Sequence, residues 1–163
     1  PFFEKVGILW LTGSIHPAQE HFISNIIRQK MIAAIDKLPL QYTKKHKTFL
    51  LFLPENELHE IGLLFYNYLI RKNGHKVIYL GQTVPFNDLI EVNNIHNIDV
   101  FVSSFVANVD ENIIREYIKK LSDTFINKTI LLNGYQIMKY EEALPDNIIR
   151  LESAKMLKSF LES

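Results

Sequence analysis

The chain has 163 residues, 47% of them apolar, with 18 basic and 18 acidic residues and no cysteine. Nucleic-acid binding requires a clustered basic surface, which a chain of balanced charge does not suggest. The absence of cysteine excludes disulfides and thiolate metal ligands. No apolar stretch approaches the roughly 20 residues that are needed to cross a membrane. We expect a cytoplasmic protein with one or two small domains, and the start at Pro1, without an initiator methionine, indicates part of a longer protein.

Residues 1–38 have the pattern of a helical-bundle segment. Apolar residues between positions 2 and 11 lie on roughly one helical face, and Gly13-Ser14 then breaks the helix. Pro17 suits the first turn of a second helix, whose apolar spacing continues to about Asp36. Two helices cannot bury both apolar stripes by themselves, so we expect further helices or a partner chain to complete a bundle.

A linker at 39–46 separates this segment from residues 47–163, where the pattern changes. Near-continuous apolar runs, typical of strands buried on both faces, occur at Thr48–Leu53, Lys76–Leu80, Asp99–Phe105, Lys128–Leu132 and Asn147–Leu151. Amphipathic segments lie between and after them, at about 57–73, 86–94, 110–122, 136–143 and 153–162. The alternation predicts an α/β domain with a flavodoxin-like, five-stranded parallel sheet, preceded by part of a helical bundle.

The stretches that follow the predicted strands contain small or polar residues. They are His59, Gly81–Pro85, Ser103–Phe105 and Asn133–Tyr135. Ligands of such sheets bind beyond the carboxyl ends of the strands. Because the strands are parallel, these stretches should share one edge of the sheet, with room there for a flat ligand and a buried tail.

The six residues from Glu57 to Gly62 form the most informative motif. A histidine at the end of a buried strand can ligate a metal from a loop, and an acid two residues earlier can orient its imidazole. A glycine three residues later lets a large ligand approach the backbone. With Glu57, His59 and Gly62 at its fixed positions, the motif resembles the D/E-x-H-x-x-G signature of cobalamin-binding domains, in which the histidine replaces the cofactor's own base beneath cobalt.

A second spacing lies upstream, where Trp10 is followed, after nine residues, by Glu20 and His21. It resembles the upper-face motif of the cobalamin-dependent, light-sensing repressors of the MerR type (the CarH/LitR group), and the combined resemblance covers nearly the whole chain. It implies that Trp10 lies over the upper face of the corrin and that Glu20 contacts the ribose hydroxyls of an adenosyl group. It also implies that His21 takes the upper cobalt position once light breaks the cobalt–carbon bond.

The resemblance extends to the other strand ends. In cobalamin domains an S-x-L and a Gly-Gly accommodate the displaced nucleotide tail; here Ser103-Ser104-Phe105 has Phe in place of Leu, and Asn133-Gly134 has Asn in place of the first Gly. Asn tolerates left-handed backbone angles better than most residues, so the turn can survive. The full set implied to bind the cofactor is Trp10, Glu20, His21, Glu57, Leu58, His59, Gly62, Thr83, Val84, Ser103, Phe105, Asn133 and Gly134.

The leading interpretation is the non-enzymatic sensor region of a MerR-family transcriptional repressor, built on a Rossmann-like cobalamin-binding domain. The resemblance implies a photoreceptor with adenosylcobalamin as its cofactor, methylcobalamin and hydroxocobalamin being the other candidate forms. It implies His59 as the lower axial cobalt ligand and self-association, as a dimer or tetramer, that changes with light. DNA would be bound only through an N-terminal domain outside this chain.

Two alternatives stay open. One is the corrinoid shuttle protein of a methyltransferase system, which also joins a helical bundle to a cobalamin domain. A shuttle must expose its upper cobalt face, so a lid made by Trp10, Glu20 and His21 argues against it. The other alternative is a regulator of the same fold that has lost cobalamin, because the side chain of Asn133 can narrow the tail pocket.

Overall fold

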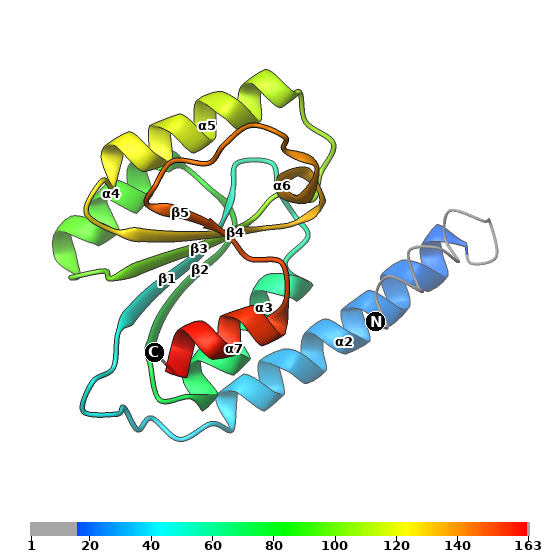
Figure 1. Ribbon diagram of the computed structural model, residues 1–163. Helices are drawn as coiled ribbons and strands as arrows, with labels where there is room; N and C mark the ends of the chain where they lie inside the picture. The colour runs from blue at the N-terminus through cyan, green and yellow to red at the C-terminus, as the bar shows by residue number, and fades with distance from the viewer. Residues whose placement is uncertain (1–15, 163) are drawn as a thin grey trace.

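The computed structural model describes residues 16–162, which form an α/β domain with one helix before it (Figure 1). The five strands are all parallel and lie in the order β2-β1-β3-β4-β5. They span Thr48–Pro54 (β1), Lys76–Val84 (β2), Val100–Ser104 (β3), Thr129–Asn133 (β4) and Ile148–Arg150 (β5). The predicted flavodoxin-like α/β fold is therefore confirmed, with its topological switch point between β1 and β3.

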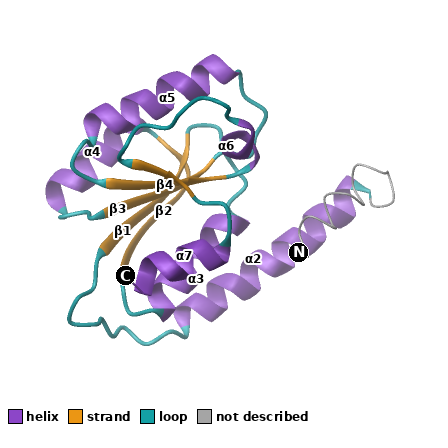
Figure 2. Ribbon diagram, viewed as in Figure 1, coloured by secondary structure: helices purple, strands orange, loops and turns teal. Residues whose placement is uncertain are grey.

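Helices cover both faces of this sheet. They span Pro17–Asp36 (α2), Ile61–Lys72 (α3), Phe86–Ile95 (α4), Glu111–Thr124 (α5), Tyr135–Lys139 (α6) and Ala154–Glu162 (α7). Helices α4 and α5 lie on one face, α3 and α7 lie on the other, and α2 packs on the outside of α3 (Figures 1 and 2). Strands enclosed in this way must be apolar on both sides, which is why their sequences do not alternate.

The central strand β1 shows this packing most clearly. Leu50 and Phe52 point into the apolar cluster under α4 and α5, whereas Phe49 and Leu51 point into the cluster under α3 and α7. All four side chains are fully buried. Because β1 lies between β2 and β3, the loop that follows it meets the carboxyl ends of both neighbours.

Helix α2 begins at Pro17 and ends at Asp36, as the sequence predicts. Ile35 is the single buried residue of this helix, whereas Phe22 is 68% exposed. The helix expected at 2–11 and its Trp10 lie outside the described residues, so the helical bundle and the division into 1–38, 39–46 and 47–163 stay predictions. None of the helices described is long and apolar enough to cross a membrane.

Three predicted boundaries are wrong. The helix expected at 136–143 spans only Tyr135–Lys139. The helix expected to open at Glu57 begins only at Ile61, because the Glu57 carboxylate accepts backbone N–H groups and holds the preceding residues in a loop. Strand β2 continues to Val84, where a loop was expected after Leu80. Shifts in its register against β1, together with positive φ angles at Gly81 (82°) and Thr83 (55°), let the strand continue as an irregular edge.

A buried histidine joins the start of the sheet to the last helix. His75 Nδ1 accepts the N–H of Lys47 at 3.1 Å, and Nε2 lies 3.2 Å from the carbonyl oxygen of Leu161. A neutral imidazole with its proton on Nε2 satisfies both contacts, whereas the protonated ring loses the one from Lys47. Burial lowers the pKa of His75, and the positive charges of Lys47 and His46 lower it further, against the raising effect of the Leu161 hydrogen bond.

The lowered pKa of His75 predicts a loss of stability in mild acid. The unfolded chain binds this proton more readily than the folded one, so stability is fully present above the ordinary histidine pKa of about 6.5 and falls as the pH drops below it. Urea unfolding should therefore give a lower midpoint at pH 5.5 than at pH 7.5, and His75→Gln should reduce that difference. The same difference in wild type and variant would contradict the assignment, and His96→Gln, at an exposed position, serves as the control.

Candidate functional site

The candidate site is the loop of residues 57–60 between β1 and α3, at the carboxyl edge of the sheet. Strand β1 ends at Pro54, and a turn follows in which Asn56 adopts a positive φ of 67°. The chain then passes through Glu57 and His59 before α3 starts. This loop borders the switch point between β1 and β3, where open α/β sheets bind their ligands.

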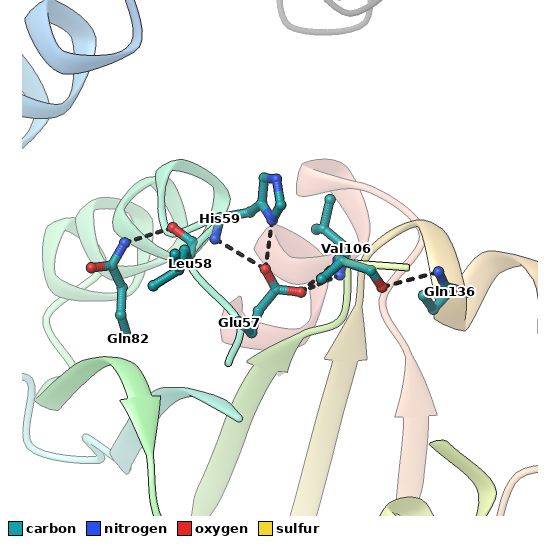
Figure 3. Close-up of polar contacts among 7 residues, drawn as sticks. Glu57, Leu58, His59, Gln82, Val106 and Gln136 are labelled. Carbon is teal, nitrogen blue, oxygen red and sulfur yellow. Dashed lines mark hydrogen bonds and ion pairs between the residues drawn. The ribbon is translucent and has the colours of Figure 1, made fainter. Parts of the chain in front are cut away.

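Glu57 anchors this loop from beneath, and its side chain is only 6% exposed. Its Oε1 accepts the backbone N–H of His59 at 3.0 Å and contacts the imidazole Nδ1 at 2.6 Å. Its Oε2 accepts the N–H groups of Val106 and Ala107, each at 2.7 Å (Figure 3). Burial by itself raises the pKa of Glu57, but these hydrogen bonds outweigh it and the pKa lies below its usual range, so the group stays a carboxylate.

The imidazole of His59 is held at one nitrogen, and within residues 16–162 its other nitrogen makes no hydrogen bond. Nδ1 faces the Glu57 carboxylate, while the ring, 61% exposed, points away from the sheet (Figure 3). A neutral ring that donates its Nδ1 proton to a carboxylate presents the Nε2 lone pair outward, which is the arrangement of a metal-ligating histidine with its orienting acid.

The remaining backbone of the loop is also fixed. Gln82 on β2 donates its side-chain amide to the carbonyl oxygen of Leu58 at 2.6 Å, and Gln136 on α6 donates to the carbonyl oxygen of Ala107 at 3.0 Å (Figure 3). Neither glutamine is distinguished by the sequence pattern, although Gln82 lies in the stretch Gly81–Pro85 that was predicted to line this edge. The loop is therefore preorganised, as a ligand-holding group needs to be.

The donor set of this edge suits one particular kind of metal. No group of three or more metal-binding side chains occurs among residues 16–162. A bare transition-metal ion such as zinc needs three or four protein ligands. A single histidine fits a metal whose other positions are already filled by a macrocycle.

The space around the loop also fits a large flat group. A side-chain carbon placed at Gly62 would meet no atom within 4 Å, so the first turn of α3 is open above the backbone. The hydroxyl of Ser103, at the end of β3, is fully buried and has no hydrogen-bond partner within the described part of the chain. An unpaired buried hydroxyl is unusual, and a ligand acceptor that reached it would satisfy it.

The expected tail-binding residues lie together at the ends of β3 and β4. The N–H of Phe105 donates to the carbonyl oxygen of Asn133 at 2.8 Å, and the Asn133 side chain donates to the carbonyl oxygen of Leu151 at 2.7 Å. Phe105 is buried, and beside it lies a cavity of about 210 Å³ lined also by Tyr117 and Gln136. Typical ligand pockets have about 300–1,000 Å³, so most of a large ligand would lie over this edge and not within it.

The other candidates occupy three different settings. Thr83 is exposed near the Gln82 contact, whereas Val84 packs into the core under α4 and α5. Glu20 and His21 lie in the first turns of α2, where Glu20 accepts the hydroxyl of Ser24 at 2.6 Å and His21 is 76% exposed. No contact in the described residues joins either of them to the His59 loop, and Trp10 lies outside those residues.

Comparison with known proteins supports the resemblance. No family model matches the chain. Over 89 residues the chain is 35% identical to the HTH-type transcriptional repressor CarH of Myxococcus xanthus, a match that spans 55% of this chain and 29% of the repressor. The chain contains a CarH-like region. The likeness covers less than a third of CarH, so activity and partners of the whole repressor do not transfer by identity alone.

A solved structure matches almost the whole chain in fold. The monomethylamine corrinoid protein of Methanosarcina barkeri superposes with a TM-score of 0.77 over 98% of this chain and 77% of its own, at 18% identity. At that identity the likeness concerns the fold. It includes α2 as well as the α/β domain, since nearly all residues are covered.

Proposed function

We propose that the chain is the cobalamin-binding sensor region of a transcriptional regulator and that it acts by binding, not by turnover. The observation that carries this proposal is the Glu57–His59 pair, a preorganised imidazole with an outward Nε2 at the switch point of the sheet. The CarH-like sequence supports the regulator function, and the corrinoid-protein fold is consistent with cobalamin binding.

Each residue of the edge has a definite task in this proposal. His59 would hold cobalt through Nε2, and Glu57 would hold the Nδ1 proton so that Nε2 keeps its lone pair. Gly62 leaves room for the corrin over α3, and Ser103 donates its hydroxyl to the nucleotide tail. The bound group supplies a cobalt–carbon bond that visible light can break when the upper ligand is adenosyl.

The finer proposal concerns the upper face and regulation. We infer that Trp10, Glu20 and His21 cover the upper face, with Glu20 facing the ribose hydroxyls of adenosylcobalamin and His21 available to cobalt after illumination. Light would then change self-association of the chain, and DNA binding would belong to an N-terminal domain outside it. A ligand can drive such a change only if it favours one assembly over the other.

A corrinoid shuttle is the second candidate function, because the monomethylamine corrinoid protein shares the fold over 98% of this chain. A shuttle needs an open upper face for its partner enzyme, so Glu20 and His21 would have no task there. The third candidate, a regulator without cobalamin, rests on Asn133 at the tail-binding edge, where the resembling domains have Gly.

Spectroscopic titration with adenosyl-, methyl- and hydroxocobalamin, in the dark and after illumination, distinguishes these three candidate functions. We expect a changed visible spectrum on binding, and a gain of roughly 4 kcal/mol in unfolding free energy at about 1,000 times the dissociation constant. In the regulator reading, His21→Ala keeps dark binding but loses a stable illuminated form. Equal behaviour of wild type and His21→Ala favours the shuttle, and neither spectral nor thermal change with any cobalamin rejects cobalamin binding.

A further inference from the structure

The residue after His59 carries a second, separate set of contacts. The Glu60 side chain is only 6% exposed, and its Oε1 pairs with the guanidinium Nε of Arg28 on α2. Its Oε2 accepts the hydroxyl of Tyr79, on β2, at 3.0 Å. These three residues, the Glu60 cluster, connect three elements that are distant in the sequence.

The cluster is the polar attachment of α2 to the rest of the molecule. Within residues 16–162, no other side chain of α2 makes a hydrogen bond or ion pair with the α/β domain. Helix α2 also packs on α3 through apolar side chains: Ile35 is buried about 10 Å further along the helix axis, and Ile27 and Met31 are partly buried. Arg28 is therefore the charged contact that fixes α2 against the start of α3, and releasing it would let the helix shift without breaking another polar side-chain contact to the domain among the described residues.

The partners of Glu60 cannot be lost without consequence. A buried carboxylate is stable only when it is paired and hydrogen-bonded. Arg28 supplies the charge, while burial and the neighbouring carboxylate raise the pKa of Tyr79, which keeps its hydroxyl protonated as a donor. Glu60 is also the N-cap residue of α3, and its backbone carbonyl oxygen accepts the N–H of Leu64 at 2.8 Å. Its backbone therefore belongs both to the end of the His59 loop and to the first turn of α3.

We propose that Glu60 couples ligation at His59 to the position of α2 through Arg28 and Tyr79. The inference rests on the proposed function. Glu57 is fixed to the loop after β3 and Leu58 to β2, so a displacement of the His59 backbone passes toward Glu60 and through Arg28 into α2. Glu20 and His21 lie on the same helix, about two turns before Arg28. The lower ligand and the residues proposed for the upper face are thus joined by one ion pair.

Hydrogen–deuterium exchange of the chain, with and without hydroxocobalamin, tests the coupling. In the wild type, cobalamin should change exchange in both 57–64 and 17–30. In Arg28→Met, which keeps an apolar stem but removes the charge, the change at 57–64 should persist and the change at 17–30 should disappear. By reciprocity the variant should also alter cobalamin affinity, typically 5–150-fold for coupled sites.

Two further variants separate coupling from a general loss of structure. Arg28→Met combined with Glu60→Gln removes the pair without leaving an unpaired buried charge, and it should also lose the response of α2. Arg115→Met breaks another arginine–glutamate pair, between Arg115 on α5 and Glu142, and should respond like the wild type.

The outcomes distinguish this inference from the proposed function beneath it. A bound spectrum with no exchange change in 17–30 of the wild type, or with that change retained in Arg28→Met, rejects the coupling and leaves cobalamin binding intact. Absence of any bound spectrum rejects both.

Discussion

His59→Ala should abolish tight cobalamin binding or return the cofactor to its own base, with a visible spectrum unlike that of the wild-type complex. Removing an outer partner of a metal ligand typically costs about 10–100-fold in affinity, so loss of the ligand itself should exceed that. The fold should persist, because the His59 ring is mostly exposed and Glu57 keeps the N–H groups of Val106 and Ala107.

Two controls are needed for the His59→Ala experiment: substitution of a second exposed histidine, and a measurement of the stability of both variants. His96→Ala, at an exposed position after α4, should bind like the wild type. Unfolding midpoints of both variants without cobalamin should be within a few degrees of the wild type. Unchanged cobalamin affinity and an unchanged spectrum in His59→Ala would reject His59 as the ligand, even if the chain still binds cobalamin.

The Glu57–His59 pair, which stays a candidate for the lower ligand, could be found in the sequence because its parts are neighbours in the chain. Glu57, His59 and Gly62 are within six residues, so their spacing is visible without a fold. The Glu57 carboxylate is also held by the backbone N–H groups of Val106 and Ala107. Every residue except proline has such a group, so the sequence gives no sign of these contacts. They could be found only once the parallel sheet had placed the end of β3 beside the end of β1.

The accuracy of the predicted strand and helix boundaries also depends on which contacts are visible in the sequence. Apolar runs predicted the strands well because both faces of the sheet are covered, but the first helix of the domain was extended to Glu57. Acidic residues favour helix starts, and here the Glu57 side chain instead competes for backbone donors and keeps the loop open. The Arg28–Glu60 pair was invisible for a different reason, since its partners lie 32 residues apart.

Gly134→Ala should destabilise the fold by about 2–4 kcal/mol. Gly134 has φ 105° and ψ 165°, a conformation open essentially only to glycine. A side-chain carbon there would lie 2.3 Å from the carbonyl oxygen of Phe105, which already accepts the N–H of Gln136. Neither backbone can move aside without breaking the junction of β3 and β4, so thermal unfolding should shift downward by roughly 5–15 °C.

Gly62→Ala should have the opposite effect on stability. The two glycine variants therefore distinguish a residue needed for the fold from one needed for ligand binding. Gly62 is helical and has nothing within 4 Å of the position of an added carbon, so alanine should stabilise α3 by up to about 1 kcal/mol. That same carbon would enter the space proposed for the corrin, so cobalamin affinity should fall while the melting temperature without cobalamin rises. Retained affinity in the stabilised variant would mean that the open space above Gly62 is not where the ligand lies.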